Sequence, residues 1–203
     1  MQQLRPGLWT WTAPHPEWRG DEGDPEGWDR AVRSYAYDSG ACLVLIDPMA
    51  PPSLLEGLVE SKDVAVLLTE HCHVRSAADC VERFGATVHA MKDAVPKLSL
   101  PAQAFERGDT LPGGVVAQVE CYPFEAIFWI PAERAIVAGD ALLGGEHGLR
   151  VQPESWHDEG TTPAAFRNRL RPLLDLPIEL VLLTHGDPVL ADGREALRAA
   201  LDT

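Results

Sequence analysis

The chain has 203 residues, of which 45% are hydrophobic and 24% are charged, an ordinary composition for a globular protein. Its formal net charge of −14 argues against nucleic acid or an anionic membrane as a partner, because phosphate binding needs a basic face. No apolar run reaches the length that spans a bilayer, and no signal-peptide pattern opens the chain. We therefore expect one domain over residues 1–203, located in the cytoplasm, with its four cysteines as thiols.

Hydrophobic periodicity and turn residues predict the elements in chain order. Strands are expected at residues 8–12, 41–46, 64–69, 87–90, 115–120, 126–130, 135–138 and 180–183. Helices are expected at residues 53–59, 76–84, 161–174 and 193–201, the second opened by a Ser76–Asp79 capping box. Residues 17–30 carry six acids and are expected to form a solvated loop. This mixture of strands and helices predicts a mixed fold class, α/β in the broad sense and α+β in the narrower one.

Two apolar strands end alike, VAVLLTEH at 64–71 and ELVLLTHG at 179–186. If they lie in sheets that pack together, both deliver a histidine to one rim, where binding groups gather in α/β folds. In an extended segment, residues two apart share a face, so we expect His71 and His73 to point together and Cys72 to point away. Two neutral imidazoles on one face can bind a divalent metal, and Asp140 after the strand 135–138 adds a carboxylate.

These segments together resemble the metallo-β-lactamase superfamily. TEHCHVRS resembles its T-x-H-x-H-x-D-H loop, VAGDALLGG its G-D-x-L motif, and LLTHGDPVL its closing histidine motif. LVLIDP resembles its early strand ending in aspartate, and the closing segment is most similar to the hydroxyacylglutathione-hydrolase-like branch. The resemblance covers almost the whole chain and implies a four-layer αββα sandwich with a metal site at one rim.

The resemblance implies a ligand set that this sequence only partly keeps. His71 and His73 match two ligands of the first metal, and counting back from Trp129 places Cys121 where the family has a third histidine. A cysteine thiolate is a good zinc ligand, so these three residues are predicted to hold one ion.

The second metal site is less complete. Asp140 and His185 match two of its ligands, but Arg75 and Ser76 stand where the family has aspartate and histidine. A guanidinium is always cationic and repels a metal ion, so we expect Arg75 to replace the second metal's charge and to pair with Asp140. This predicts zinc or iron, one ion at most, with a metal-free site as the alternative. Ser76 is better explained as the cap of its helix than as a nucleophile.

The function predicted first is a metal-dependent hydrolase acting on a small-molecule thioester, ester or lactone. In this hypothesis Asp140 orients the attacking water or acts as general base, and Arg75 holds an anionic part of the substrate. The alternative is a metal-free member of the fold that binds a small ligand or a protein. A third hypothesis is an interaction protein whose tryptophans form a homodimer surface; they are Trp9, Trp11, Trp18 and Trp28.

Two acids near the site have open roles in the sequence. Asp47 ends the strand 41–46 before a proline, and either makes a turn or supports a metal ligand. Glu70 is either a carboxylate behind the ligands or a solvated loop charge.

Overall fold

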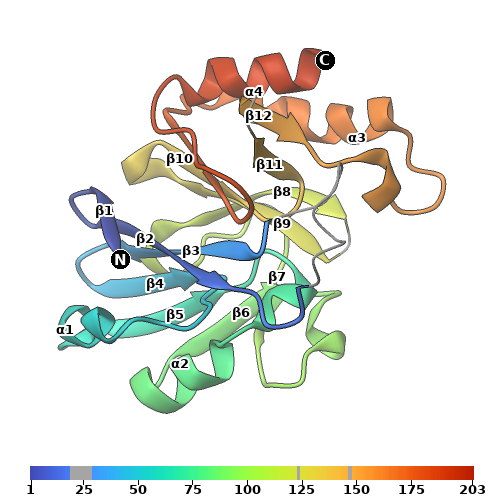
Figure 1. The fold of residues 1–203 in the computed structure, drawn as a ribbon. Helices are drawn as coiled ribbons and strands as arrows, with labels where there is room; N and C mark the ends of the chain where they lie inside the picture. The colour runs from blue at the N-terminus through green and yellow to red at the C-terminus, as the bar shows by residue number, and fades with distance from the viewer. Residues whose placement is uncertain (19–28, 123, 146–147) are drawn as a thin grey trace.

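The computed structural model describes residues 1–18, 29–122, 124–145 and 148–203. Two β-sheets pack face to face, and helices cover the outer face of each (Figure 1). The expected αββα sandwich is therefore confirmed. Most of the expected acidic loop, together with Trp28, lies outside the described residues. None of the described helices has the length and apolar character needed to cross a membrane.

The larger sheet has seven strands that follow one another in chain order. They are β1 (Gln2–Arg5), β2 (Leu8–Pro14), β3 (Ala31–Asp38), β4 (Cys42–Ile46), β5 (Asp63–Leu67), β6 (Thr87–Met91) and β7 (Gln103–Phe105). The strands from β4 to β7 run parallel, so their carboxyl ends meet at one edge of the sheet. This edge carries the loop after β5 that contains the two histidines.

The smaller sheet has four strands in the order β13-β10-β9-β8. They are β8 (Val116–Tyr122), β9 (Glu125–Ile130), β10 (Ala135–Ala138) and β13 (Leu180–Leu183). β10 and β13 run parallel and end side by side, which brings the segments after them together. A two-stranded sheet, β11 (Leu142–Gly145) and β12 (Gly148–Val151), follows β10.

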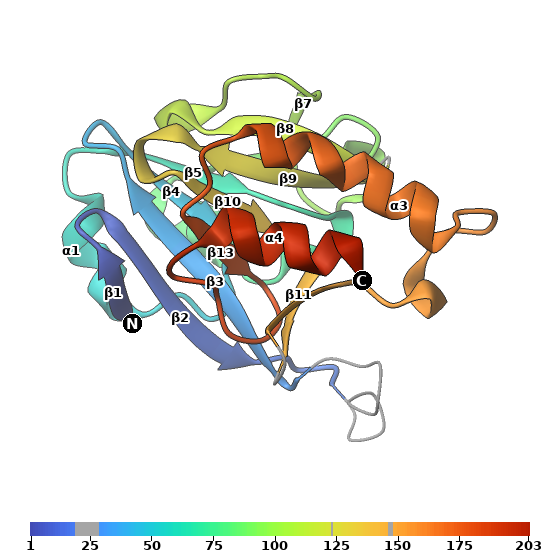
Figure 2. The ribbon, with the colours of Figure 1, turned by 90° about the horizontal axis from the view of Figure 1, so that it is seen from above.

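Two apolar cores hold the layers together. The first lies between the sheets and beneath α1 (Glu56–Val59) and α2 (Ala77–Phe84), and it includes fully buried Leu45 and Phe128. The second lies between the smaller sheet and α3 (Pro163–Leu170) and α4 (Gly193–Asp202), which cross its outer face (Figure 2). Burial of side chains such as Phe166 and Leu197 removes apolar area from water and fixes these helices on the sheet.

The expected strands are all present, but some elements differ. The sequence did not predict β1, β3, β7, β11 or β12. The helix expected at 161–174 gives way to a 3₁₀ turn at Arg171–Asp175, because Pro172 has no N–H to continue the α-helical hydrogen bonds. The helix expected at 53–59 is one 3₁₀ turn followed by the short α1.

Trp11, one of the tryptophans considered for a dimer surface, is buried in the first core. Its indole N–H donates to the Met49 carbonyl at 2.7 Å. This residue therefore stabilises the loop after β4 and contributes little to any exposed face.

The two sheets are joined at the end of β13 by strand β3. The buried Tyr35 hydroxyl donates to the Leu183 carbonyl at 2.7 Å and accepts from the Leu183 N–H at 2.8 Å. Next to it, the Arg33 N–H donates to the Thr184 carbonyl at 2.8 Å. These bonds satisfy the last backbone groups of β13 and fix the position of the residue that follows, His185.

Tyr35→Phe is expected to lower the free energy of unfolding by about 1–3 kcal/mol, because it leaves a buried N–H and a buried carbonyl without a partner. Urea denaturation measures the loss. The matched control is Tyr37→Phe on the same strand, whose hydroxyl makes no hydrogen bond within the described part of the chain. Equal losses in the two variants would show that the Tyr35 hydroxyl does not join the sheets.

Candidate metal centre

Three polar side chains converge where β5, β10 and β13 end. His73 Nε2 lies 3.3 Å and His185 Nε2 lies 3.2 Å from the same oxygen, Asp140 Oδ1. Neither contact is aligned as a hydrogen bond, and Asp140 Oδ1 has no such partner among the described residues. Both histidines are nearly buried, at 5% and 6% exposure. The structure therefore brings three possible ligand atoms to one point.

Asp47 orients His73 from the other side of the ring. Its Oδ2 lies 3.1 Å from His73 Nδ1, and its Oδ1 accepts from the Thr69 N–H at 2.9 Å. The Thr69 hydroxyl also donates to Asp47 Oδ2. A carboxylate on one ring nitrogen fixes the tautomer and leaves the other nitrogen for a ligand role. Of the two roles open for Asp47, support of a histidine is therefore the one the structure shows.

The charges in this cluster control one another. Burial and Arg75 lower the pKa of His73, but Asp140 and Asp47 outweigh them and raise it to about 10. Burial would raise the pKa of Asp140, yet His73 and His185 hold it well below its usual value. In the protein without a metal, His73 is thus an imidazolium between two carboxylates.

The backbone is strained at two positions around the cluster. Asp47 and Arg75 adopt φ angles of 46° and 43°. An arginine rarely has this conformation, which costs on the order of 1–3 kcal/mol. The Ser76 N–H holds the second turn in place by donating to the Pro48 carbonyl at 2.9 Å. The conformation of Asp47 places its carboxylate next to the His73 ring. The conformation of Arg75 turns the chain sharply after the histidines.

Glycines allow the segments of the site to approach closely. A Cβ on Gly139 would lie 2.6 Å from Thr69 Oγ1 and 3.1 Å from Glu125 Oε1. Gly186 has a φ of 80°, and a side chain there would collide with the backbone of Gly144. The Gly144 N–H in turn donates to the His185 carbonyl at 2.9 Å. These contacts fix Asp140 and His185 relative to β5.

Residues 71–74 form a 3₁₀ turn, and this corrects the expected direction of the side chains. His71 does not share a face with His73: its Nδ1 lies 2.9 Å from Glu70 Oε1, and its ring packs edge-on against Phe124. Cys72 does not point away from the site. Its Sγ, a nitrogen of His73 and an oxygen of Asp140 all lie within 4.8 Å of one another. The prediction failed because it assumed an extended segment.

Glu125 is a site residue that the sequence analysis missed. It opens β9 and is 1% exposed. Its Oε1 accepts from the backbone N–H groups of Asp140 at 2.9 Å and Ala141 at 2.8 Å, and its Oε2 has no hydrogen-bond partner among the described residues. Burial, Glu70 and Asp140 raise its pKa well above the usual value. The available signal was an acid at the start of the otherwise apolar strand EAIFWI.

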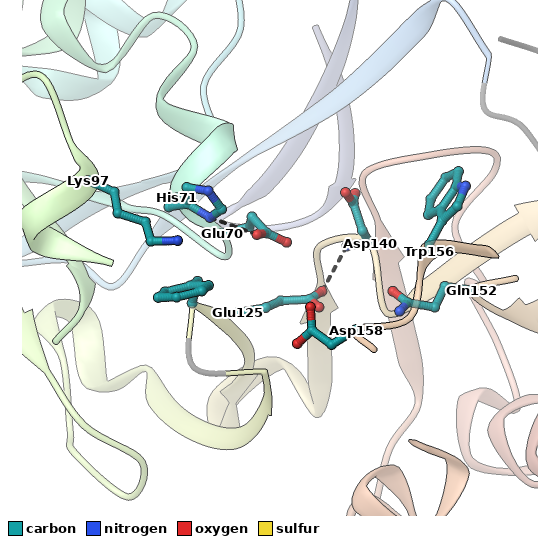
Figure 3. Close-up of a pocket in the computed structure, with 9 residues that line it drawn as sticks. Glu70, His71, Lys97, Glu125, Asp140, Gln152, Trp156 and Asp158 are labelled. Atoms are coloured by element: carbon teal, nitrogen blue, oxygen red, sulfur yellow. Dashed lines mark hydrogen bonds and ion pairs between the residues drawn. The ribbon is translucent and has the colours of Figure 1, made fainter. Parts of the chain in front are cut away.

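A cavity of about 390 Å³ opens beside the cluster. Four carboxylates line it, from the segments after β5, β10 and β12 and from β9 (Figure 3): Glu70, Glu125, Asp140 and Asp158. Its other lining residues are His71, Lys97, Phe124, Gln152 and Trp156. Glu70 thus has a third position that the sequence did not suggest, the wall of a cavity.

Comparisons with known proteins support the fold. No family model matches the chain, and no curated protein matches it. Among solved structures, a metallo-beta-lactamase family protein from Thermus thermophilus, TTHA1429, is 18% identical, with a TM-score of 0.68 over 98% of this chain and 79% of that one. TTHA1623, solved in a di-iron-bound form, is 27% identical, with a TM-score of 0.62 over 81% of this chain and 92% of that one. An archaeal superfamily protein from Sulfolobus tokodaii, ST1585, is 13% identical, with a TM-score of 0.67 over 97% of this chain and 85% of that one.

This chain has the metallo-β-lactamase fold. Within the fold, the cluster of His73, Asp140 and His185 lies at the rim where the resemblance placed the metal site. The similarity to these solved structures extends to the fold, and the chemistry of the site depends on the residues that this chain places there.

Cys121 lies apart from the cluster in this metallo-β-lactamase fold. It belongs to the second core, beneath α3, with Ile127 and Phe166. Its carbonyl accepts from Arg169 at 2.8 Å. β8 shifts register between Ala117 and Val119 and again across Cys121, so counting along the hairpin does not determine which face a side chain takes. Among the described residues, the thiol grouped with His73 and Asp140 is that of Cys72.

Two expectations for the segment after the histidines are wrong. Arg75 does not pair directly with Asp140: its guanidinium donates to the carbonyls of Arg33 and Asp47, at 3.2 and 3.0 Å. Its charge still acts on the cluster, because it lowers the pKa of both Asp47 and His73. The Ser76 hydroxyl makes no capping bond to its helix and instead accepts from the Ala50 N–H at 2.9 Å. The site therefore uses Ser76 to hold the loop after β4.

The raised pKa of His73 predicts pH-dependent stability in protein freed of metal. Its ordinary value is 6.5 and its value here is about 10, so the folded state binds this proton more tightly than the unfolded state. The stabilisation is fully present below pH 6.5 and is lost as the pH rises through about 10. Urea denaturation in EDTA is expected to show this loss in the parent and a smaller one in His73→Gln.

Thiol ionisation also lowers stability at high pH, but it is common to both proteins and cancels in the comparison. Parallel stability curves for parent and variant would show that His73 is not a buried imidazolium.

Proposed function

We propose that this chain is a metal-dependent hydrolase that holds one divalent ion, zinc or iron, through His73, His185 and Asp140. The observation that carries the proposal is the convergence of two imidazole nitrogens on one unaligned carboxylate oxygen, at 3.3 and 3.2 Å. Separations of this size are typical of neighbouring ligands on one ion, whose bonds are about 2.0–2.2 Å long.

The donor set suits such an ion. Two histidines and one carboxylate are a common set for zinc and for non-haem iron, and they leave positions open for substrate. The contact of Asp47 with His73 Nδ1 directs Nε2 toward the site, as in other carboxylate–histidine–metal arrangements. The Cys72 thiol lies close enough to add a fourth ligand. Metal binding would displace the proton from His73 Nε2, so affinity is expected to rise with pH.

The bound ion would supply Lewis-acid polarisation of a substrate carbonyl and an activated water. The chain's own residues do the rest. Asp140 positions both histidines, and the cavity beside it receives the substrate. Glu70 and His71, 2.9 Å apart on the cavity wall, can accept a proton and pass it on. The substrate class that fits this chemistry is an ester, thioester or lactone.

A second candidate is a metal-free member of the fold that binds a ligand. The buried guanidinium of Arg75 favours it, because a fixed cation beside His73 and Asp47 opposes an incoming metal ion. With His73 protonated, Arg75 and His73 balance Asp47 and Asp140 without any ion. Metal content separates the two candidates.

Protein purified without a histidine tag is expected to contain about one zinc or iron per chain, measured by elemental mass spectrometry. His185→Ala removes one of the three proposed ligands. The variant is expected to lose most of this metal, because the two remaining ligands bind the ion more weakly than three do. Cys72→Ser is expected to weaken retention against a chelator, and Cys121→Ser is its matched control with unchanged retention.

Absence of metal from the parent after incubation with zinc would reject the hydrolase and favour the metal-free candidate. Loss of metal from Cys121→Ser, with its fold intact by circular dichroism, would assign the thiol ligand to Cys121 instead.

Arg75→Gln is expected to raise the affinity for zinc by about tenfold or more, because it removes a buried positive charge near the ion. Glutamine keeps one donor for the Asp47 and Arg33 carbonyls. Competition with a chromophoric chelator measures the affinity, and Arg83→Gln on α2, which pairs with Glu56 away from the site, is the control. An unchanged or lower affinity would show that Arg75 does not oppose metal binding.

A further inference from the structure

The cavity beside the metal centre has the size and walls of a site for a small organic molecule. Its volume of about 390 Å³ far exceeds that of a single ion and falls in the range of small-molecule pockets, about 300–1,000 Å³. Two aromatic side chains, Phe124 and Trp156, belong to its lining. The ligand that occupies it must also satisfy the charge of the lining.

Acidic side chains dominate that lining. Glu70, Glu125 and Asp158 line the cavity in addition to Asp140, and none of the first three is a ligand in the proposed metal centre. The basic side chain in the lining, Lys97, makes no ion pair with them among the described residues. Its ammonium lies 3.4 Å from the centre of the Phe124 ring instead. An anionic acyl donor of the hydroxyacylglutathione kind is disfavoured here, because like charges repel at short range.

Glu125 points to a specific kind of ligand. Two backbone N–H bonds fix its Oε1, so the direction of Oε2 is fixed as well. Oε2 is buried and has no hydrogen-bond partner among the described residues, and the side chain extends toward the cavity beneath Asp140 (Figure 3). Because the pKa of Glu125 is raised, its carboxyl holds a proton while the cavity is empty, and a cationic N–H placed at Oε2 would favour the ionised form.

We propose that this cavity binds a small molecule through a primary ammonium group, which donates to Glu125 Oε2 and is attracted by Glu70, with its carbon chain against Trp156. The inference deepens the proposed hydrolase, since it makes the substrate an amine-bearing ester or thioester. Binding of the amine itself does not require the metal.

The test uses the full chain in EDTA at neutral pH, with butylammonium as the probe and isothermal titration calorimetry as the readout. Butylammonium is expected to bind, whereas 1-pentanol, of similar size without charge, and butyrate are not. Glu125→Gln is expected to weaken binding by about tenfold, because a neutral acceptor makes a weaker bond than a carboxylate. Glutamine keeps an oxygen for the two backbone donors, so the fold is retained.

Two further variants sharpen the test. Asp158→Asn is expected to weaken binding by a smaller factor, since the proposed ammonium donates to Glu125 and not to Asp158. The control is Glu106→Gln, an exposed glutamate that pairs with Lys92 away from the cavity, and it is expected to bind as the parent does.

Equal binding of pentanol and butylammonium, or no binding of butylammonium to the parent, would overturn the proposal. So would a Mn²⁺ site, detected by electron paramagnetic resonance, that is lost in Glu125→Gln and excludes the amine, because the carboxylates would then hold a metal. Failure of the hydrolase appears separately, as a parent without metal or turnover whose amine binding is intact. Failure of amine binding with metal held through His185 rejects this inference alone.

Discussion

The buried contact between Asp47 and His73 connects the sheet to the site. Asp47 follows β4, accepts from the N–H of Thr69 just after β5, and reaches the ring of His73 in the following turn. A carboxylate without these partners would not remain ionised in the core, because burial disfavours its charge. The contacts of Thr69 and His73 with Asp47 therefore keep this buried carboxylate ionised. The position of His73 Nε2, and through it the contact with Asp140, follows from these contacts.

A second constraint comes from the other sheet. His185 follows β13, and its position depends on β3 of the larger sheet through Tyr35 and Arg33. Asp140 follows β10, which is paired with β13, so the two residues cannot move independently. The site thus lies where two sheets are tied at the ends of their strands. Rigid elements of this kind can keep polar side chains close together despite the cost of burying them.

The sequence predicted the features that depend on local pattern and strand ends. The apolar runs gave the core strands, and the matching ends of the strands before His71 and His185 correctly suggested one rim. The sequence predicted side-chain directions wrongly where they depend on the local backbone conformation. The 3₁₀ turn at 71–74 exchanges the directions of His71 and Cys72, and the irregular β8 directs Cys121 to the helix layer. Hydrophobic periodicity signals neither the 3₁₀ turn nor the irregularity of β8. In the expected and in the observed conformation alike, these residues are buried or close to the site.

Arg75 and Glu125 determine the electrostatics of the site from two sides. Arg75 places a positive charge near the cluster of His73 and Asp140, and Glu125 places an acid of raised pKa on the cavity side of it. The two side chains act on different regions: Arg75 opposes cations at the buried centre, and Glu125 offers an acceptor to a cationic donor in the cavity. A ligand that places its positive charge in the cavity and its reacting carbonyl toward Asp140 fits both the cavity and the buried centre. The metal-dependent and metal-free candidates therefore use the same pocket. The acids of the cavity act on the ligand whether or not a metal ion occupies the centre.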